Sequence, residues 1–148
     1  MSSLLRQLAG GDRRSIGKAN QVVAQILAGP RHLAEIMSGI GHEDVLVRMR
    51  CADVAEKVSV VHPEWLVPYK ALILGLAAEA TEQELRWHLA QILPRLGLDG
   101  QERQGAVAVM FAYLKDHSRI VQASAMQALA EFAANKAAPA ARTDTLVA

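Results

Sequence analysis

Residues 43–58, EDVLVRMRCADVAEKV, carry the clearest helical pattern in the chain. Their apolar positions recur at intervals of three and four residues, as in Val47, Cys51 and Val54, which is the period of one face of an α-helix. The same spacing continues through most of the chain, while alternating runs of β-branched residues are nearly absent. The sequence therefore predicts an all-α fold.

Glycines, prolines and short polar residues interrupt this pattern and divide the chain into about eight helices. The expected first members of helical pairs are 2–9, 31–40, 64–79 and 101–115, and the second members are 12–28, 44–61, 82–97 and 118–135. Pro68 and Pro94 lie inside two of these helices and predict bends, because proline removes an amide donor. The range 64–79 is apolar almost all round, which predicts packing on both sides.

The second members of the pairs share an apolar stripe, which we align to test for an internal repeat. The stripe opens at Ile16, Val47, Leu85 and Val121, which are 31, 38 and 36 residues apart. Four residues further on it continues with Asn20, Cys51, Leu89 and Ala125, of which only Asn20 is polar. This spacing lies in the range of two-helix repeats, so the sequence predicts stacked helical hairpins.

Short oxygen-bearing side chains mark several expected helix starts, because they satisfy the free amides of a first turn. They are Asp12, Thr81 and Ser118. Thr81 and Glu84 also have the spacing of a capping box. Residues 136–148, by contrast, are rich in alanine and proline, cannot build a packed face, and are predicted to form a flexible tail.

The second members resemble the second helices of HEAT repeats, in which acidic or capping residues precede Val-Arg and small apolar residues. The best match has Asp44, Val47, Arg48, Ala52 and Ala55; residues 81–93 repeat it with Leu85, Arg86, Ala90 and Ile92, and residues 116–132 with Val121, Gln122 and Ala125. The resemblance covers residues 1–135. It implies a HEAT-like repeat domain, a short right-handed α-α superhelix (solenoid) of about four hairpins.

The resemblance also assigns roles to individual residues. In HEAT repeats the recurring arginine ties one repeat to the next, which implies a structural inter-repeat role for Arg48 and Arg86. The second helices line a concave groove, where a partner would meet Arg50, Asp53, Trp87 and His88. Trp87 is the expected anchor, because tryptophan and arginine dominate interface energetics. Packing of Trp87 between repeats as ordinary core is the alternative.

Composition excludes several broad classes of function. The chain has 148 residues and a formal net charge of +1, so charge alone predicts neither general nucleic-acid binding nor binding to acidic lipids. The most apolar run is shorter than the roughly 20 residues that cross a bilayer, and no membrane association is expected. A lone cysteine, Cys51, and the absence of a signal-peptide pattern favour a cytoplasmic location.

Motifs for cofactor, metal or nucleophile chemistry are incomplete. The stretch 10–19 lacks the first glycine and the hydroxyl residue of a phosphate-binding loop, and Leu46 stands where a zinc-protease helix needs its second histidine. The five histidines are ten or more residues apart, so no local metal pair is expected. Cys51 occupies a stripe position, where a thiol acts as a small apolar group. We therefore expect no cofactor, no metal and no catalytic residue.

These observations favour a non-catalytic protein-interaction or scaffold module that binds another protein or peptide through the groove of second helices. One alternative is a nucleic-acid-binding enzyme like the HEAT-like DNA glycosylases, with Asp53, Trp87 and Arg50 at its cleft. Another is a lyase-accessory or chaperone-like role, by resemblance to the HEAT-like repeats of bilin lyases. Self-association as a homodimer is compatible with each, because short solenoids have apolar terminal faces.

Overall fold

The protein is all-helical, as predicted. The structure is a computed structural model that describes residues 3–9 and 18–147, and the side chains of residues 3–9 and 18–135. Over those residues it contains eight α-helices and three short 3-10 helices and has no strand. Their bounds in chain order are α1 (Ser3–Leu8), α2 (Ala19–Ala28), η1 (Pro30–His32), α3 (Leu33–Gly39), α4 (Val45–Val61), η2 (Pro63–Tyr69), α5 (Lys70–Glu79), α6 (Gln83–Ile92), η3 (Leu93–Arg95), α7 (Gly100–Tyr113) and α8 (Arg119–Val147).

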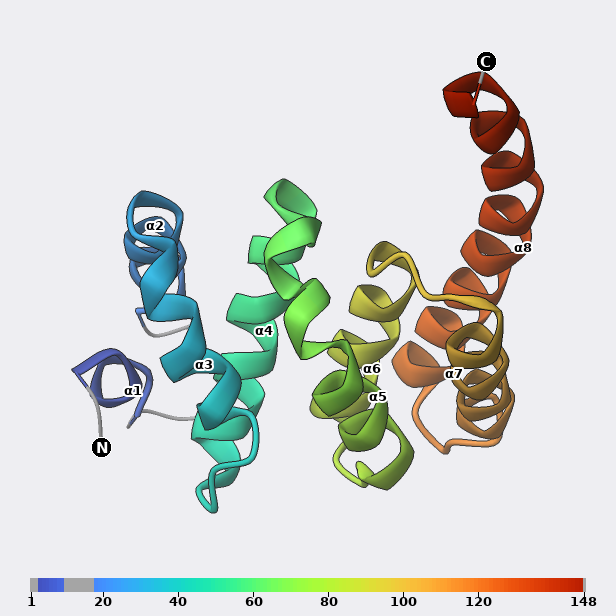
Figure 1. Ribbon diagram of the computed structural model, residues 1–148. Helices are drawn as coiled ribbons and strands as arrows, with labels where there is room; N and C mark the ends of the chain where they lie inside the picture. Colours follow the sequence, from blue (N-terminus) through green and yellow to red (C-terminus); the bar gives the residue numbers. More distant parts are fainter. Residues whose placement is uncertain (1–2, 10–17, 148) are drawn as a thin grey trace.

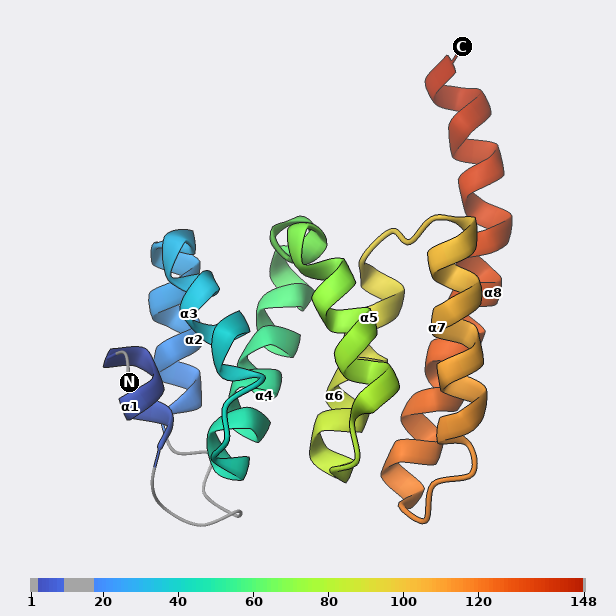
Figure 2. The same ribbon diagram turned by 60° about the horizontal axis from the view of Figure 1, so that its bottom comes forward.

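The helices form two rows (Figure 1). In one row α2, α4, α6 and α8 contact each other in succession. In the other row α3 packs on α4, α5 on α6 and α7 on α8, and Figure 2 shows these helices in front of the first row. The short helix α1 lies at the N-terminal edge, where it contacts α2, α3 and α4.

The apolar stripe forms the core between the two rows. Its predicted positions in α4, α6 and α8 are all buried, among them Val47, Leu85 and Val121. In α2 the prediction was wrong by one residue: Ala19, Val22 and Ile26 are buried, whereas Asn20 is exposed. The predicted stripe opener Ile16 and the predicted helix start Asp12 lie outside the described residues. With the corrected register, the four second helices bury side chains at the same spacing: Ala19, Cys51, Leu89 and Ala125; Val22, Val54, Ile92 and Ala128; Ile26, Val58, Leu96 and Phe132. Of these, Leu96 directly follows η3 and does not lie in α6 itself.

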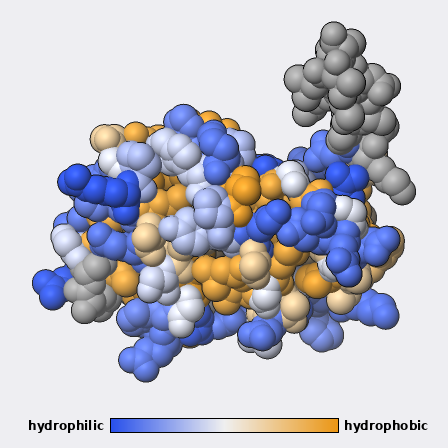
Figure 3. Space-filling view, viewed as in Figure 1, coloured by the Kyte–Doolittle hydropathy of each residue, from blue (hydrophilic) through white to orange (hydrophobic). Residues whose placement is uncertain are grey.

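The two prolines at which the sequence predicts bends lie in 3-10 helices and not inside an α-helix. Pro68 lies in η2 and Pro94 in η3, so each marks a 3-10 segment next to an α-helix. The expectation that residues 64–79 are packed on both sides was wrong, because Leu72 in α5 is 43% exposed. Figure 3 shows hydrophobic surface over η2 and α5 in the middle of this face, with hydrophilic residues around it.

The end of the chain differs from the expected boundary at residue 135. Helix α8 begins at Arg119 and its backbone continues to Val147, through the range 136–147 that the sequence assigns to a flexible tail. The side chains of this range lie outside the described residues, so the tail stays a prediction. None of the helices in the described part of the chain combines the length and the apolar character that a bilayer-spanning segment needs.

Candidate functional site

A repeated polar contact marks the start of each described second helix from α4 onward. Arg48 Nη1 donates to the carbonyl of His42 at 2.7 Å, and Arg86 Nε donates to the carbonyl of Ala80 at 2.7 Å. Gln122 Nε2 donates to the carbonyl of Asp116 at 2.6 Å. In each case the acceptor lies six residues before the donor, so equivalent side chains brace the turn that precedes each helix.

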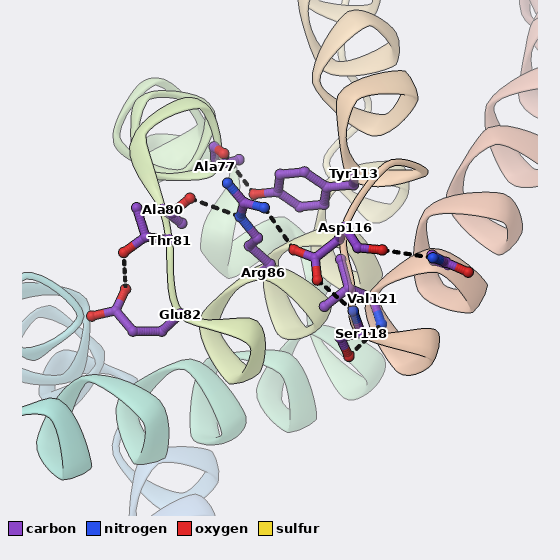
Figure 4. A network of polar contacts seen from close by, with 10 residues as sticks. Ala77, Ala80, Thr81, Glu82, Arg86, Tyr113, Asp116, Ser118 and Val121 are labelled. Carbon is purple, nitrogen blue, oxygen red and sulfur yellow. Dashed lines mark hydrogen bonds and ion pairs between the residues drawn. The ribbon is translucent and has the colours of Figure 1, made fainter.

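The two arginines also connect adjacent hairpins. Arg48 Nη2 forms an ion pair with Glu82, which is the N-cap residue of α6. Arg86 Nη1 forms the corresponding pair with Asp116 at 2.6 Å, in the turn before α8 (Figure 4). Arg48 and Arg86 therefore each connect the turn before their own helix to the turn before the next second helix.

Around Arg86 this contact becomes a small network that α7 helps to build (Figure 4). The Arg86 guanidinium lies 5.0 Å from the ring centre of Tyr113, whose hydroxyl donates to the carbonyl of Ala77 at 2.6 Å. The amide of Ser118 donates to Asp116 Oδ1 at 2.7 Å and lowers the pKa of that carboxyl; burial opposes this effect, and Arg86 adds to it. The network consists of satisfied polar groups and has a structural role.

A second polar cluster lies between α4 and α6. It contains Asp53 and Glu56 from α4 and His88 from α6, and one ligand atom from each residue lies within 4.8 Å of the other two. Asp53 and Glu56 share a face of α4 because residues three apart on a helix are neighbours. The packing of α6 on α4 brings His88 to them, with Nε2 4.0 Å from Asp53 Oδ1.

Each carboxylate of this cluster also holds a basic side chain. Lys57 Nζ lies 3.1 Å from Asp53 Oδ2 and 3.2 Å from Asn20 Oδ1. Arg95 Nη1 lies 2.7 Å from Glu56 Oε2 and 2.8 Å from the hydroxyl of Ser59. Asp53 therefore has two different contacts: Oδ1 faces His88, and Oδ2 forms an ion pair with Lys57.

His88 is the most enclosed member of the cluster, since its side chain is 12% exposed. Burial lowers the pKa of His88 below its ordinary value of 6.5, whereas Asp53, Gln91 and Glu56 act in the opposite direction. The imidazole is therefore neutral at pH 7 and keeps a lone pair on one ring nitrogen. Within the described residues, His88 Nδ1 and Gln91 Oε1 are buried without a hydrogen-bond partner.

The four residues predicted to meet a partner lie in different surroundings. Asp53 and His88 belong to the polar cluster, and Trp87 is half-buried against the core with its ring 5.0 Å from the His88 ring. Arg50 is 6% exposed, and its Nη1 donates to the carbonyl of Leu8 at 2.5 Å. The expectation that Arg50 lines a groove was therefore wrong, because its guanidinium is directed into the interior to satisfy the end of α1.

Cys51 is fully buried in α4, and burial raises the pKa of its thiol to about 12. A protonated, enclosed thiol is a poor nucleophile. Its burial in the core agrees with the prediction that this thiol acts as a small apolar group.

A further feature that the sequence analysis missed is an apolar groove of about 690 Å³ between α7 and α8. Its walls include Val107, Phe111 and Leu129, and Phe111 is 57% exposed. Arg103 also lines the groove, and its Nε is buried without a hydrogen-bond partner in the described part of the chain. The signal in the sequence was the aromatic Phe111 in α7, which pattern alone could not distinguish from a core position.

Comparison with known proteins does not identify a family. Neither the protein-family models, nor the curated proteins, nor the solved structures give a match to this chain.

Proposed function

We propose that the chain is a short right-handed HEAT-like solenoid that acts as a non-catalytic protein-interaction module. Two features support the solenoid part of the proposal. Four second helices bury side chains at equivalent positions, and Arg48, Arg86 and Gln122 brace successive turns at the same offset. Such equivalence is expected where each hairpin contacts mainly its neighbours.

The groove between α7 and α8 carries the interaction part of the proposal. These helices form the last hairpin, which α5 and α6 contact on one side. This hairpin has an apolar groove, and Phe111 lies at its surface. An exposed apolar groove of this kind is typical of a protein-interaction site.

The occupant that fits this groove is an amphipathic helix of another protein, with apolar residues at intervals of three and four and an acidic residue near one end. The apolar walls suit the apolar stripe of a helix. The buried Arg103 Nε needs an acceptor, and a carboxylate is the strongest one for a guanidinium. The row of second helices contributes less exposed surface, because Arg50 is interior and His88 is 12% exposed.

The test is to select helical peptides on the full chain from a displayed library of amphipathic sequences and to measure their affinity by fluorescence anisotropy. We expect peptides that combine an apolar stripe with an acidic residue. The variant Phe111→Asp should weaken binding at least tenfold, and Arg103→Gln should weaken binding only of peptides that carry the acidic residue. Val60→Asp is the matched control, because Val60 is 62% exposed on α4 and lies outside the groove.

Helicity measured by circular dichroism should be equal in all of these variants, since Phe111 is an exposed side chain. Equal affinity of the selected peptides for the wild type and for Phe111→Asp would refute the groove. Light scattering tests a different occupant: a dimer of the wild type that Phe111→Asp dissociates would show that a second copy of the chain fills the groove instead.

A further inference from the structure

We propose that Asp53, Glu56 and His88 form a binding site for one divalent transition-metal ion of the Zn²⁺ class between α4 and α6. Imidazole and carboxylate groups are the protein ligands that, with thiolates, Zn²⁺ uses most. This inference is independent of the α7–α8 groove, because the cluster lies on a different pair of helices.

The geometry of the three donor groups supports the site. Their ligand atoms lie within 4.8 Å of one another. Zn²⁺ holds nitrogen and oxygen ligands at about 2.1 Å, which places two ligands of a tetrahedral site roughly 3.4 Å apart. The donors therefore need to approach each other by up to about 1.4 Å, and rotation of the Asp53 and Glu56 side chains on one face of α4 can supply this.

The second ring nitrogen of His88 has surroundings that are compatible with a metal on the first. His88 Nε2 is the ring nitrogen directed toward Asp53, while Nδ1 and Gln91 Oε1 are buried without a hydrogen-bond partner among the described residues. A metal on Nε2 requires the proton on Nδ1, and metal-bound histidines usually donate that proton to an oxygen. Gln91, three residues further along α6, has this oxygen and already influences the pKa of His88.

The basic residues of the cluster fit a role around the ligands. Arg95 contacts Glu56 Oε2 and Lys57 contacts Asp53 Oδ2, so each cation contacts one oxygen of its carboxylate. Hydrogen bonds of this kind orient metal-binding carboxylates. Lys57 is 36% exposed and can turn to solvent when the ion neutralises Asp53, which limits the repulsion between the two positive charges.

The experiment titrates the full chain, first treated with a chelator, with ZnCl₂ in an isothermal calorimeter, and with CoCl₂ by visible absorption. We expect one ion per chain, and a tetrahedral Co²⁺ spectrum. His88→Gln and Asp53→Asn should each raise the dissociation constant at least tenfold, because each removes one of three protein ligands. Zn²⁺ should also raise the melting temperature of the wild type and leave that of His88→Gln unchanged.

The matched control is His32→Gln. His32 Nδ1 lies 3.4 Å from Glu35 in an exposed pair, so it offers a histidine and a carboxylate without the third donor. Its dissociation constant should equal that of the wild type. Loss of binding in His32→Gln would assign the ion to surface histidines, and equal affinity of the wild type, His88→Gln and Asp53→Asn would overturn the site. Circular dichroism checks that each variant is folded. If His88→Gln does not fold, Asp53→Asn still tests the site.

Discussion

Among the described glycines, Gly39 has the least room for a side chain. A Cβ atom added there would lie 2.5 Å from Cys51 Sγ and 2.6 Å from Leu5 Cδ2, so a methyl group would push α1, α3 and α4 apart. Overpacking of this kind costs about 1–3 kcal/mol, so Gly39→Ala should lower the free energy of unfolding by that amount in urea titrations. Gly75→Ala is the control: nothing lies within 4 Å of its added Cβ, and alanine should stabilise α5 by up to about 1 kcal/mol. Equal effects of the two substitutions would contradict this close approach.

Asp116 gives the stability a defined dependence on pH. Its folded pKa is lowered, so the stabilisation is present above the unfolded value near 3.8 and is lost as pH falls through the folded pKa. Asp116→Asn keeps an oxygen for the Ser118 amide and loses the charge that faces Arg86. The variant should be about 1 kcal/mol less stable at pH 7, with a smaller difference at pH 3, because pH 3 lies below the unfolded pKa near 3.8 and part of the stabilisation is already lost there. Urea titrations at both pH values measure this; a constant difference would exclude the ion pair as its source.

At the scale of single elements, the start of α7 shows what sequence spacing can and cannot locate. The predicted capping box at Thr81 and Glu84 was wrong, because α6 begins one residue later, with Glu82 as its N-cap. A capping box forms instead at α7, where Asp99 accepts from the amide of Glu102 at 2.8 Å and Glu102 accepts from the amide of Asp99 at 2.9 Å. Both sites have the residue types that a capping box requires. The box forms only where the helix begins directly after the capping residue, which depends on the backbone.

Asp99→Ala should therefore destabilise the protein by about 1 kcal/mol, since it removes the side chain that satisfies the first turn of α7. The comparison is Thr81→Ala, which removes a hydroxyl one residue before the N-cap and should change the stability by less than about 0.5 kcal/mol. Thermal melts followed by circular dichroism report both changes. A larger loss in Thr81→Ala would restore the capping box predicted from the sequence.

At the scale of the whole molecule, periodicity predicted the helices and most of the buried stripe, because a helix that buries one face needs an apolar residue in every turn of that face. The register of α2 was misplaced, since Ile16 and Val23 fit the spacing almost as well as Ala19, Val22 and Ile26. The cluster of Asp53, Glu56 and His88 could not be predicted. Its members come from two helices whose mutual orientation is a tertiary property, and the local spacing of histidines carries no information about it.

The two-row arrangement also predicts how the molecule opens. Helix α4 contacts α2 and α3 on one side and α6 on the other, whereas α1 has six residues and lies at the edge. Arg50 holds the end of α1 through its bond to the Leu8 carbonyl, and loss of a hydrogen bond to a charged group costs roughly 1.5–3 kcal/mol. In Arg50→Met, amide hydrogen exchange should therefore quicken at least tenfold at Leu8 and Ala9 and stay unchanged at Leu89 in α6. If all three amides exchange faster by the same factor, α1 opens only when the whole stack unfolds, and the local role of Arg50 is refuted.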